Sequence, residues 1–560
     1  MKLTSFSFFS FVPDCELSRI IVWANTTGIR KSNRNTDGEP IPGVSVIVKG
    51  TNTGTATDID GNYILEVPPG STLVFSSVGM SRVEVPVDNQ TVINVNLEPD
   101  VVGLEEVVVT ALGISREKKR LGYSVTEVDN EEFTQGTGTN LTNALSGKVA
   151  GVQVSGGTGQ PGSSTNVVLR GYATIGRETQ PLYVVDGVQV TNMEQNFSTN
   201  GADVNRTVDF GNGINDINAQ DIENISILRG SAATALYGSA GANGVILITT
   251  KRGSALVKGG KPLISVNSIT SFSSVLRYPM FQSTFGQGWD GHFASEENGS
   301  WGPRFTNEPR LWGNEVGGRQ LYKDFSFLED QLSDFYVTGN IYDNTIAISG
   351  AGDFSTYYLS YNNVSDNGVV PGEKDKYVKN SFKLSATKQM GFIDASANFI
   401  YINKETNTIP TGQGQGGMSN LFDDLLQHPT DISLVDMENY RDPTSFYHPN
   451  NYFSPYLWNP YFSINNTSNV ANVDRLIANT SLDLSILKAY RMKGTLRFGG
   501  DVSNTFGHNY DGKFTLSDNS VNKGQQNDID GYYREFQRNV RLYNLDALIT
   551  GGVDAAEWRT

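Results

Sequence analysis

The sequence has very little cysteine and no long apolar run. Cys15 is the only cysteine, which excludes a disulfide framework and a cysteine-rich metal site. No run of about 18 apolar residues occurs, so no transmembrane helix is expected. Transmembrane strands remain possible, because barrel strands are short and alternate apolar with polar residues.

Positive charge is also scarce. The chain has 43 Lys and Arg residues against 59 Asp and Glu residues, which gives a net charge of −16. Nucleic acid is therefore not an expected partner, since phosphate binding needs clustered basic side chains.

Catalytic motifs are missing as well. The four histidines, His292, His428, His448 and His508, are scattered along the sequence and are expected to be exposed to solvent. No G-x-S-x-G elbow, complete phosphate loop or dinucleotide fingerprint occurs. We therefore expect no enzyme activity, no cofactor and no metal site.

Glycine and aromatic residues are abundant instead. The chain has 59 Gly, 24 Tyr and 28 Phe but only 6 Trp, a mixture typical of an all-β protein with many turns. Residues 36–100 alternate apolar and polar side chains at 44–48, 63–67 and 73–77, which predicts a small β-sandwich. The stretch DIDGN (58–62) favours an Asp-Gly turn over a calcium loop, because the downstream bidentate Glu is missing.

Residues 1–35 form an atypical N-terminus. Serine interrupts a Phe-rich stretch, Pro13 and Asp14 end it, and VWA (22–24) is a poor cleavage site. A signal sequence is therefore doubtful. The stretch 28–35 shows no strand alternation, so the sandwich is expected to begin only at residue 36.

Residues 116–253 mix short helices with strands. Leu141, Leu145 and Val149 recur at intervals of four residues, which predicts one face of a helix. The expected strands cover residues 167–171, 181–188, 224–229 and 244–253. Small residues between the last two strands predict a turn or a helix, so this block is expected to be a compact α+β unit.

Residues 263–560 contain about eight segments that alternate with period two. In the segment 475–488, leucine and isoleucine side chains share one side, and Asn, Ser and Asp share the other. Tight connections such as 390–391 alternate with long ones such as 405–474, which is typical of an outer-membrane barrel with short periplasmic turns. A soluble β-sandwich, whose strands also alternate, is the alternative.

The segment LEEVVVTALG (104–113) lies between the first two blocks and has no hairpin partner in the sequence. Its β-branched run, Val107 to Val109, suits an extended strand that adds to the sheet edge of another protein. A final strand of the preceding sandwich is the alternative. Residues 101–115 are therefore expected to be a partner-binding strand and its linker.

These blocks together resemble the SusC/RagA-type TonB-dependent transporters. Residues 37–79 resemble the family's carboxypeptidase-regulatory-like extension, and 104–113 resemble its TonB box and linker. Four stretches are similar to its plug motifs: ALSGKVAGVQV (144–154), VVLRG (167–171), PLYVVDGV (181–188) and ILRGSAATALYGSAGANGVILITTKRG (227–253). SWGPRF (300–305) and GVVPG (368–372) resemble signatures of the early barrel.

The resemblance implies a mainly β fold in four parts. These are a carboxypeptidase-regulatory-like β-sandwich at 36–100, a TonB box and linker at 101–115, an α+β plug domain at 116–253, and the first strands of a transmembrane β-barrel at 263–560. The family's barrel of about 22 strands needs about 220 residues within the membrane alone. The roughly eight strands found here therefore indicate a truncated, N-terminal fragment.

The resemblance also implies a function and partners. The expected function is TonB-dependent import of nutrients, either oligosaccharides or peptides, across the cell outer membrane, with the plug displaced when TonB pulls on the box. A SusD-like surface lipoprotein and outer-membrane lipid are the other implied partners. Two alternatives remain open: a soluble glycan-binding cell-surface β-sandwich protein, and a TonB-linked signal-transducing receptor.

Three groups of candidate site residues follow from these motifs. The TonB contact is expected at Leu104, Glu105, Glu106, Val107, Val108, Val109 and Thr110. The gating candidates of the plug are Arg170, Gly171, Asp186, Gly187, Arg229, Gly230, Tyr237 and Gly238. The candidates for stacking on substrate are Trp289, Trp301 and Trp312, with packing against the plug or the loops as the alternative.

Arg170, Asp186 and Arg229 carry the charges of the gating motifs. Charges at the strand ends of a plug can pair with polar residues on the barrel wall and hold the plug until force arrives. Ordinary solvated charges at strand ends are the alternative.

Overall fold

The structure is a computed structural model of the whole chain, and it divides into two compact units. The smaller unit contains the N-terminal sandwich, and the larger unit contains nearly everything after Leu121. The described residues are 20–28, 39–40, 43–51, 53–68, 70–77, 80, 82–87, 93, 95–97, 107–109, 115–117, 125–130, 140–172, 179–198, 206–253, 261–294, 296–412, 420–452, 456–487, 492–524 and 526–551.

The sandwich consists of two small sheets. One contains β1 (Ile20–Gly28), β2 (Glu39–Pro40), β5 (Asn62–Val67) and β8 (Val95–Leu97). The other contains β4 (Gly54–Ala56), β3 (Ser45–Val48), β6 (Thr72–Ser76) and β7 (Val83–Pro86), in that order. Val46, Tyr63, Val67, Leu73 and Phe75 are buried in one core, which confirms the predicted alternation.

Two predictions about the sandwich can be compared with the structure: the turn at 58–62 and the residue at which the sandwich begins. The Asp58 carboxylate accepts hydrogen bonds from the backbone N–H of Asp60 (3.0 Å) and Asn62 (2.8 Å), so DIDGN forms the predicted turn. The expected start at residue 36 is wrong, because β1 pairs antiparallel with β5 and places Ile20 opposite Val67. The stretch 28–35, which shows no strand alternation, separates β1 from the rest of the sandwich in the sequence, so local pattern does not connect the two.

The second block is built on a five-stranded sheet, here called the plug sheet. Its order is β11 (Val125–Asp129), β18 (Ile222–Leu228), β19 (Val245–Thr250), β14 (Leu182–Val185) and β15 (Val188–Val190). Smaller sheets pair β12 (Val152–Gly156) with β13 (Thr165–Leu169), and β17 (Arg206–Asn212) with β16 (Glu194–Ser198) and β27 (Thr411–Gly412).

The helices of this block are short. They are η3 (Leu141–Leu145), η4 (Gly213–Asp216), η5 (Ala219–Asp221), α2 (Ser231–Tyr237) and η6 (Gly238–Gly241). The helical face predicted from Leu141, Leu145 and Val149 is buried, but only a single 3₁₀ segment forms. The segment ends at Ser146, which is extended with a φ of −65° and a ψ of 127°, and the chain then turns at Gly147, whose φ of 75° lies in the left-handed region.

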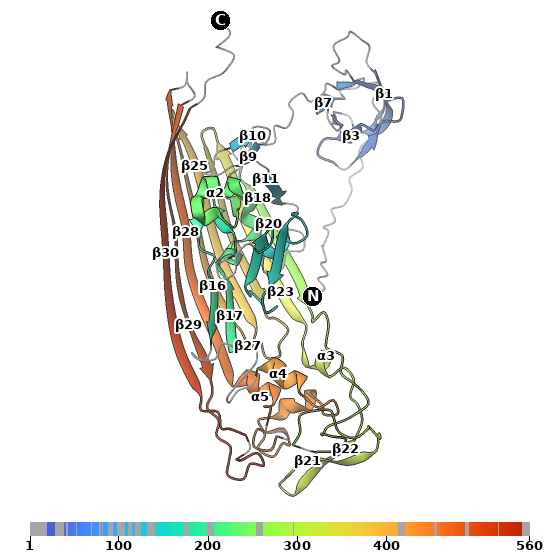
Figure 1. Cartoon of the computed structure of the whole chain (residues 1–560). Helices are drawn as coiled ribbons and strands as arrows, with labels where there is room; N and C mark the ends of the chain where they lie inside the picture. Colours follow the sequence, from blue (N-terminus) through green and yellow to red (C-terminus); the bar gives the residue numbers. More distant parts are fainter. Residues whose placement is uncertain are drawn as a thin grey trace. The chain divides into compact units, whose positions relative to one another are not determined.

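The third block forms one antiparallel sheet of eight strands, here called the wall sheet (Figure 1). Its strands in order are β20 (Leu263–Ser273), β23 (Gly339–Gly352), β24 (Ser355–Asp366), β25 (Lys376–Met390), β26 (Ile393–Asn407), β28 (Thr467–Leu487), β29 (Met492–Asp511) and β30 (Tyr532–Thr550). No helix in the described part of the chain is long and apolar enough to cross a membrane.

The two faces of the wall sheet differ in the way the alternation predicts. Leu476, Leu482 and Ile486 on β28 are exposed, whereas Ile477 on the same strand is buried in one cluster with the apolar residues of the plug. Ile402 of β26 joins that cluster. The plug therefore packs on one face of the wall sheet, and the opposite face carries exposed apolar side chains.

The connections between the wall strands alternate in length. Two-residue turns at 353–354 and 391–392 join strands at one end, whereas the links at the other end are long. The long links contain β21 (Pro309–Val316), β22 (Arg319–Asp324), α3 (Gln331–Phe335), α4 (Leu421–Leu426), η7 (Val435–Asn439) and α5 (Pro460–Asn465). Figure 1 shows these elements together at the end of the sheet opposite α2.

The long links build an apolar cluster of their own, which includes Trp312, Phe335, Leu425 and Trp458 and is here called the loop cluster. Strand β28 begins at Thr467, before the predicted start at residue 475. The pattern missed its first residues because most of them are polar on both faces of the strand.

Candidate functional site

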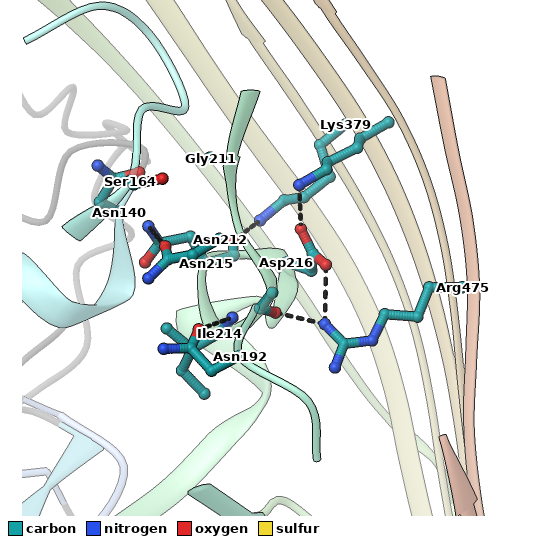
Figure 2. A network of polar contacts seen from close by, with 12 residues as sticks. Asn140, Ser164, Asn192, Gly211, Asn212, Ile214, Asn215, Asp216, Lys379 and Arg475 are labelled. Carbon is teal, nitrogen blue, oxygen red and sulfur yellow. Dashed lines mark hydrogen bonds and ion pairs between the residues drawn. The ribbon is translucent and has the colours of Figure 1, made fainter. Parts of the chain in front are cut away.

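The interface between the plug and the wall sheet contains a buried charged centre. Asp216 at the end of η4 is 1% exposed. Its carboxylate lies 2.6 Å from the Lys404 Nζ of β26 and 2.8 Å from the Arg475 Nη1 of β28 (Figure 2). Arg475 also contacts the Asp501 carboxylate of β29 at 2.8 Å. One plug carboxylate is thus tied to two wall strands, and through Arg475 to a third.

Backbone groups of the plug complete this charged centre. The Arg475 guanidinium donates to the carbonyl oxygens of Gly213 (2.5 Å) and Thr191 (2.9 Å). Asp501 in turn accepts from the Thr191 backbone N–H at 2.8 Å. Buried charges need this degree of pairing, since an isolated charge inside a protein costs far more than a pair.

The pKa of Asp216 reflects this balance of burial and charge. Burial alone would raise the pKa of Asp216, but the charges of Lys404 and Arg475 and their hydrogen bonds outweigh it and lower the pKa. Asp216 is therefore ionised, and the pairs with Lys404 and Arg475 are true ion pairs.

A network of amide side chains positions η4 on the plug (Figure 2). Asn192 accepts from the Ile214 backbone N–H at 2.9 Å, and Asn215 donates to Asn212 at 2.8 Å. The Ser164 hydroxyl donates to Asp209 at 2.6 Å. These bonds hold the segment that carries Asp216, so the charged centre is rigid on the plug side.

A second contact joins the plug to β24 and β25. Asp221 at the end of η5 accepts hydrogen bonds from the Tyr358 hydroxyl (2.9 Å) and the Ser360 hydroxyl (2.6 Å). The Lys383 ammonium donates to the Lys251 carbonyl oxygen at 2.6 Å. The plug is therefore fastened to the wall sheet here as well as at the charged centre.

The sequence reasoning missed both of these contacts. The sequence did contain a usable signal. Four basic residues of the wall strands lie on the plug-facing side, opposite the exposed apolar face: Lys379, Lys383, Lys404 and Arg475. Basic residues on the inner register predict acidic partners on whatever fills the interior.

Of the gating candidates, Asp186 and Gly187 do contact the wall sheet. They form the turn between β14 and β15, both with positive φ. The Asn479 side chain of β28 donates to the Asp186 carbonyl oxygen at 3.0 Å. The φ of 87° at Gly187 favours glycine, and a Cβ there would lie 2.4 Å from the Arg497 Nη1 and displace the guanidinium. The Asp186 carboxylate itself binds within the plug, to the Thr250 N–H at 3.0 Å.

Arg229 and Arg170 lie elsewhere, on the plug itself. Arg229 donates to the Ala150 carbonyl oxygen at 2.6 Å and to the Thr126 hydroxyl of β11. Gly230 lies against Arg170, whose Nη1 would be 3.2 Å from an added Cβ. The expected pairing of Arg229 with the wall sheet is therefore wrong. Its guanidinium donates to neighbouring segments of the plug instead.

The remaining gating candidates are Gly171, Tyr237 and Gly238. Gly171 follows Arg170 with a φ of 88°, which completes the turn after β13. Tyr237 and Gly238 mark the junction between α2 and η6, and Tyr237 faces a cavity that Asp186 also lines.

The three tryptophans differ in exposure. Trp289 is 63% exposed and Trp301 is 70% exposed, and both remain available for contact with a ligand. Trp312 is 1% exposed and donates its indole N–H to the Gln287 side chain at 2.9 Å. The expected contact of Trp312 with substrate is therefore wrong, because the loop cluster buries its side chain.

One histidine also departs from the expectation. His428 is buried, with Nε2 lying 2.7 Å from the Ile432 carbonyl oxygen, and burial lowers its pKa to about 4. Within the described residues, no group of three or more His, Cys, Asp or Glu side chains is arranged to hold a metal ion.

The valine-rich segment forms a short strand. Val107–Val109 is β9, and it pairs with β10 (Ser115–Glu117) in a two-stranded sheet that is separate from both sandwich sheets. Leu104, Glu105, Glu106 and Thr110 of the expected TonB contact lie outside the described residues.

Two family models match the chain. The TonB-dependent receptor plug domain matches residues 117–245, and the carboxypeptidase-regulatory-like domain matches residues 32–109. Among solved structures, the chain is similar to the RagAB peptide importer in its open-open state, with a TM-score of 0.52 and 17% identity over 80% of this chain and 55% of that one. This likeness shows a shared fold.

Curated relatives share more sequence. The TonB-dependent receptor P39 of Formosa agariphila is 33% identical over 72% of this chain and 34% of its own length. The TonB-dependent receptor SusC of Bacteroides thetaiotaomicron is 31% identical over 69% of this chain and 34% of its own length. The chain thus spans about a third of the length of these relatives. It is a homologue of the SusC-type TonB-dependent receptors, with a carboxypeptidase-regulatory-like domain, a plug domain and strands of the receptor barrel.

Proposed function

We propose that this chain is part of an outer-membrane transporter for oligosaccharides or peptides, in which TonB pulls on the box at 104–110 and so displaces the plug. The observation that carries the proposal is the buried charged centre at Asp216, which ties the plug to the wall sheet. Ion pairs hold such a plug closed at rest. They can also separate without leaving the charges unsolvated, because water enters the gap as the plug moves.

The wall sheet suits a membrane environment. Its outer face carries exposed apolar side chains such as Phe399, Tyr401 and Leu482. A soluble sandwich would bury this face, whereas a barrel presents it to lipid. The two-residue turns then belong on the periplasmic side, and the long links with the loop cluster face outward.

The position of β11 supports a pull from the box. It is the first plug strand after the box, and it is an edge strand paired only with β18 in the plug sheet. Force on the chain at residue 110 would therefore pass β10 and reach β11 before the other strands of the plug sheet. The opposite edge of the plug sheet, β15, lies against β29 and β30 and stays with the wall.

The proposed partners follow from the relatives. RagAB is named as a peptide importer, and we extend to this chain the pairing with a SusD-like surface lipoprotein at the end that carries the long links. TonB is the proposed periplasmic partner, recruited by strand addition to Val107–Val109. Trp289 and Trp301 are proposed substrate contacts, since their exposed rings can stack on a sugar or a peptide side chain.

Uptake by the complete protein in cells tests this function. Labelled oligosaccharides and peptides should enter the periplasm only when TonB is present, whereas binding at the cell surface should not need TonB. Loss of the lipoprotein should lower uptake without changing the amount of assembled barrel. Uptake that continues unchanged without TonB would contradict the proposal.

A further inference from the structure

The long link between β26 and β28 is bound to the plug at its first residues. Residues 408–412, here called the strap, follow β26 directly and end with β27. Strand β27 pairs with β17 of the plug, with Thr411 opposite Thr207 (Figure 1). The Thr411 hydroxyl also donates to the Thr207 carbonyl oxygen at 3.2 Å. A segment of a wall loop thus forms the third strand of a sheet that the plug begins.

The side chain of Gln160 holds the strap from a second segment of the plug. Gln160 lies in the loop between β12 and β13, and its amide group donates to the Ile409 carbonyl oxygen at 3.0 Å. The Gln160 Oε1 accepts from the Ile409 backbone N–H at 2.9 Å and from the Thr408 hydroxyl. These bonds reproduce what a neighbouring strand would offer, so a plug side chain satisfies both backbone groups of Ile409.

The two plug segments that hold the strap are joined to each other and to the charged centre. The Asp209 carboxylate of β17 accepts from the Ser164 backbone N–H at 2.9 Å and from its hydroxyl at 2.6 Å. Ser164 belongs to the same loop as Gln160. Strand β17 ends at Asn212, and η4, which carries Asp216, begins at the next residue. One short strand therefore connects the strap to the charged centre.

On its other side the strap reaches the loop cluster. Ile409 packs against that cluster, whose members include Leu421 and Leu425 of α4 and Met437 of η7. A shift of one member is passed to its neighbours, because closely packed interiors transmit strain. A continuous series of contacts thus runs from the charged centre through β17 and the strap to the end of the sheet that carries the long links.

We propose that the strap couples the plug to the loop cluster, with Gln160 as the positioning residue. Movement of the plug shifts β17 and so loosens the loop cluster through Ile409. The hold of the long links on a ligand then weakens at the moment the plug is displaced. Coupling between two sites is reciprocal, so a ligand that orders the loop cluster orders β17 as well. This inference rests on the proposed import function, in which the plug moves.

A double-mutant cycle in the complete protein tests the coupling. Arg475→Met loosens the charged centre, and hydrogen exchange at residues 421–440 should quicken about fivefold in response. Gln160→Ala removes the hydrogen bonds from Gln160 to the strap, so in that background Arg475→Met should quicken the same exchange by less than about twofold.

Gln153→Ala is the matched control for this cycle. Gln153 is exposed on β12 of the same hairpin, so its replacement should leave the response to Arg475→Met intact. A purely structural role of Gln160 predicts that the two substitutions act independently. Effects of Gln160→Ala and Arg475→Met that simply multiply would therefore overturn the strap.

Ligand binding gives the reverse measurement. A saturating oligosaccharide or peptide that the wild type imports should slow exchange at residues 206–212 of β17 about threefold when it binds from outside. The slowing should persist in Gln153→Ala and disappear in Gln160→Ala. No slowing in the wild type would overturn the coupling, and slowing that persists in Gln160→Ala would overturn the strap as its path.

The outcomes separate this inference from the function on which it rests. The double-mutant cycle needs neither TonB nor a ligand. A wild type without TonB-dependent uptake would overturn the proposed function, whereas multiplying effects in the cycle would overturn the strap alone. Where uptake occurs, Gln160→Ala should lower its maximal rate without raising the half-saturating concentration, because the long links then keep their hold on the ligand as the plug moves. A maximal rate equal to that of the wild type would contradict the role in release.

Discussion

Arg475 of the wall sheet and Asp216 of the plug form a buried ion pair with an N–O distance of 2.8 Å. The two residues are 259 positions apart in the sequence. Arg475 also pairs with Asp501 at 2.8 Å, so one guanidinium neutralises two buried carboxylates. Any movement of the plug must break this arrangement, which makes it a sensitive place to perturb.

Replacing Arg475 with Met should loosen the plug. The change removes the partner of two buried carboxylates, a loss that typically costs about 3–5 kcal/mol. Passive leakage of small solutes into cells without TonB should rise at least tenfold. Lys493→Met is the control, because the half-exposed Lys493–Asp483 pair contributes only about 0–1 kcal/mol. Leakage at the wild-type level in an assembled Arg475→Met barrel would refute a lock at this site.

Val108→Pro should abolish uptake and leave surface binding of substrate intact. Proline removes a backbone donor from β9, which a strand added to TonB would need. Val108→Ile keeps the donor and the β-branched shape, so it should transport normally. If the proline variant imports at the wild-type rate, residues 104–110 are not the TonB contact.

Arg229→Ala should loosen β11 at the edge of the plug sheet. The side chain bridges Thr126 of β11 to Ala150, and hydrogen bonds from a charged group contribute about 1.5–3 kcal/mol. Hydrogen exchange of residues 125–129 in the assembled protein should therefore quicken at least tenfold. Arg170→Ala leaves both contacts in place and serves as control. Unchanged exchange in Arg229→Ala would show that β18 pairing alone holds the strand.

The tryptophans should separate into two classes. Replacing both Trp289 and Trp301 with Ala should weaken surface binding of substrate without lowering stability, because both rings are largely exposed. Trp312→Ala should instead destabilise the loop cluster by about 3–5 kcal/mol, since it empties a buried site. Ligand titration and thermal melting of the purified complete protein measure the two effects. Full-strength binding by the double variant would exclude those rings as contacts.

Acid should loosen the loop cluster through His428. Burial lowers its pKa to about 4, whereas the unfolded chain takes up the proton near its ordinary pKa of about 6.5. The stabilising contribution is therefore complete above about pH 6.5 and is lost as the pH falls toward about 4. Local stability of residues 421–440 should be about 2 kcal/mol lower at pH 5 than at pH 7.5.

Hydrogen exchange corrected for its intrinsic pH dependence measures this difference. His428→Gln should remove most of it, and His292→Gln should not, because His292 is exposed. A pH dependence that survives in His428→Gln would assign it to another group.

Local pattern in the sequence was enough to predict the strands and their faces. Leu476 and Leu482 lie on the outer face because a strand alternates with period two wherever it forms. The same reasoning placed Val46 and Phe75 inside the sandwich. It failed at residues 141–149, where the apolar spacing suited an α-helix but the chain turns at Gly147 after one 3₁₀ segment.

Only the tertiary structure decided which side chains meet. Asp216 contacts Lys404, 188 residues away, and neither strand pattern nor motif identifies that pairing. Arg229 binds Thr126 within the plug, although its motif alone fitted a contact with the wall equally well. Trp312 and Trp301 look alike in the sequence, yet one is buried and the other exposed. Alternation depends on neighbours along the chain, whereas burial and charge pairing depend on segments that only folding brings together.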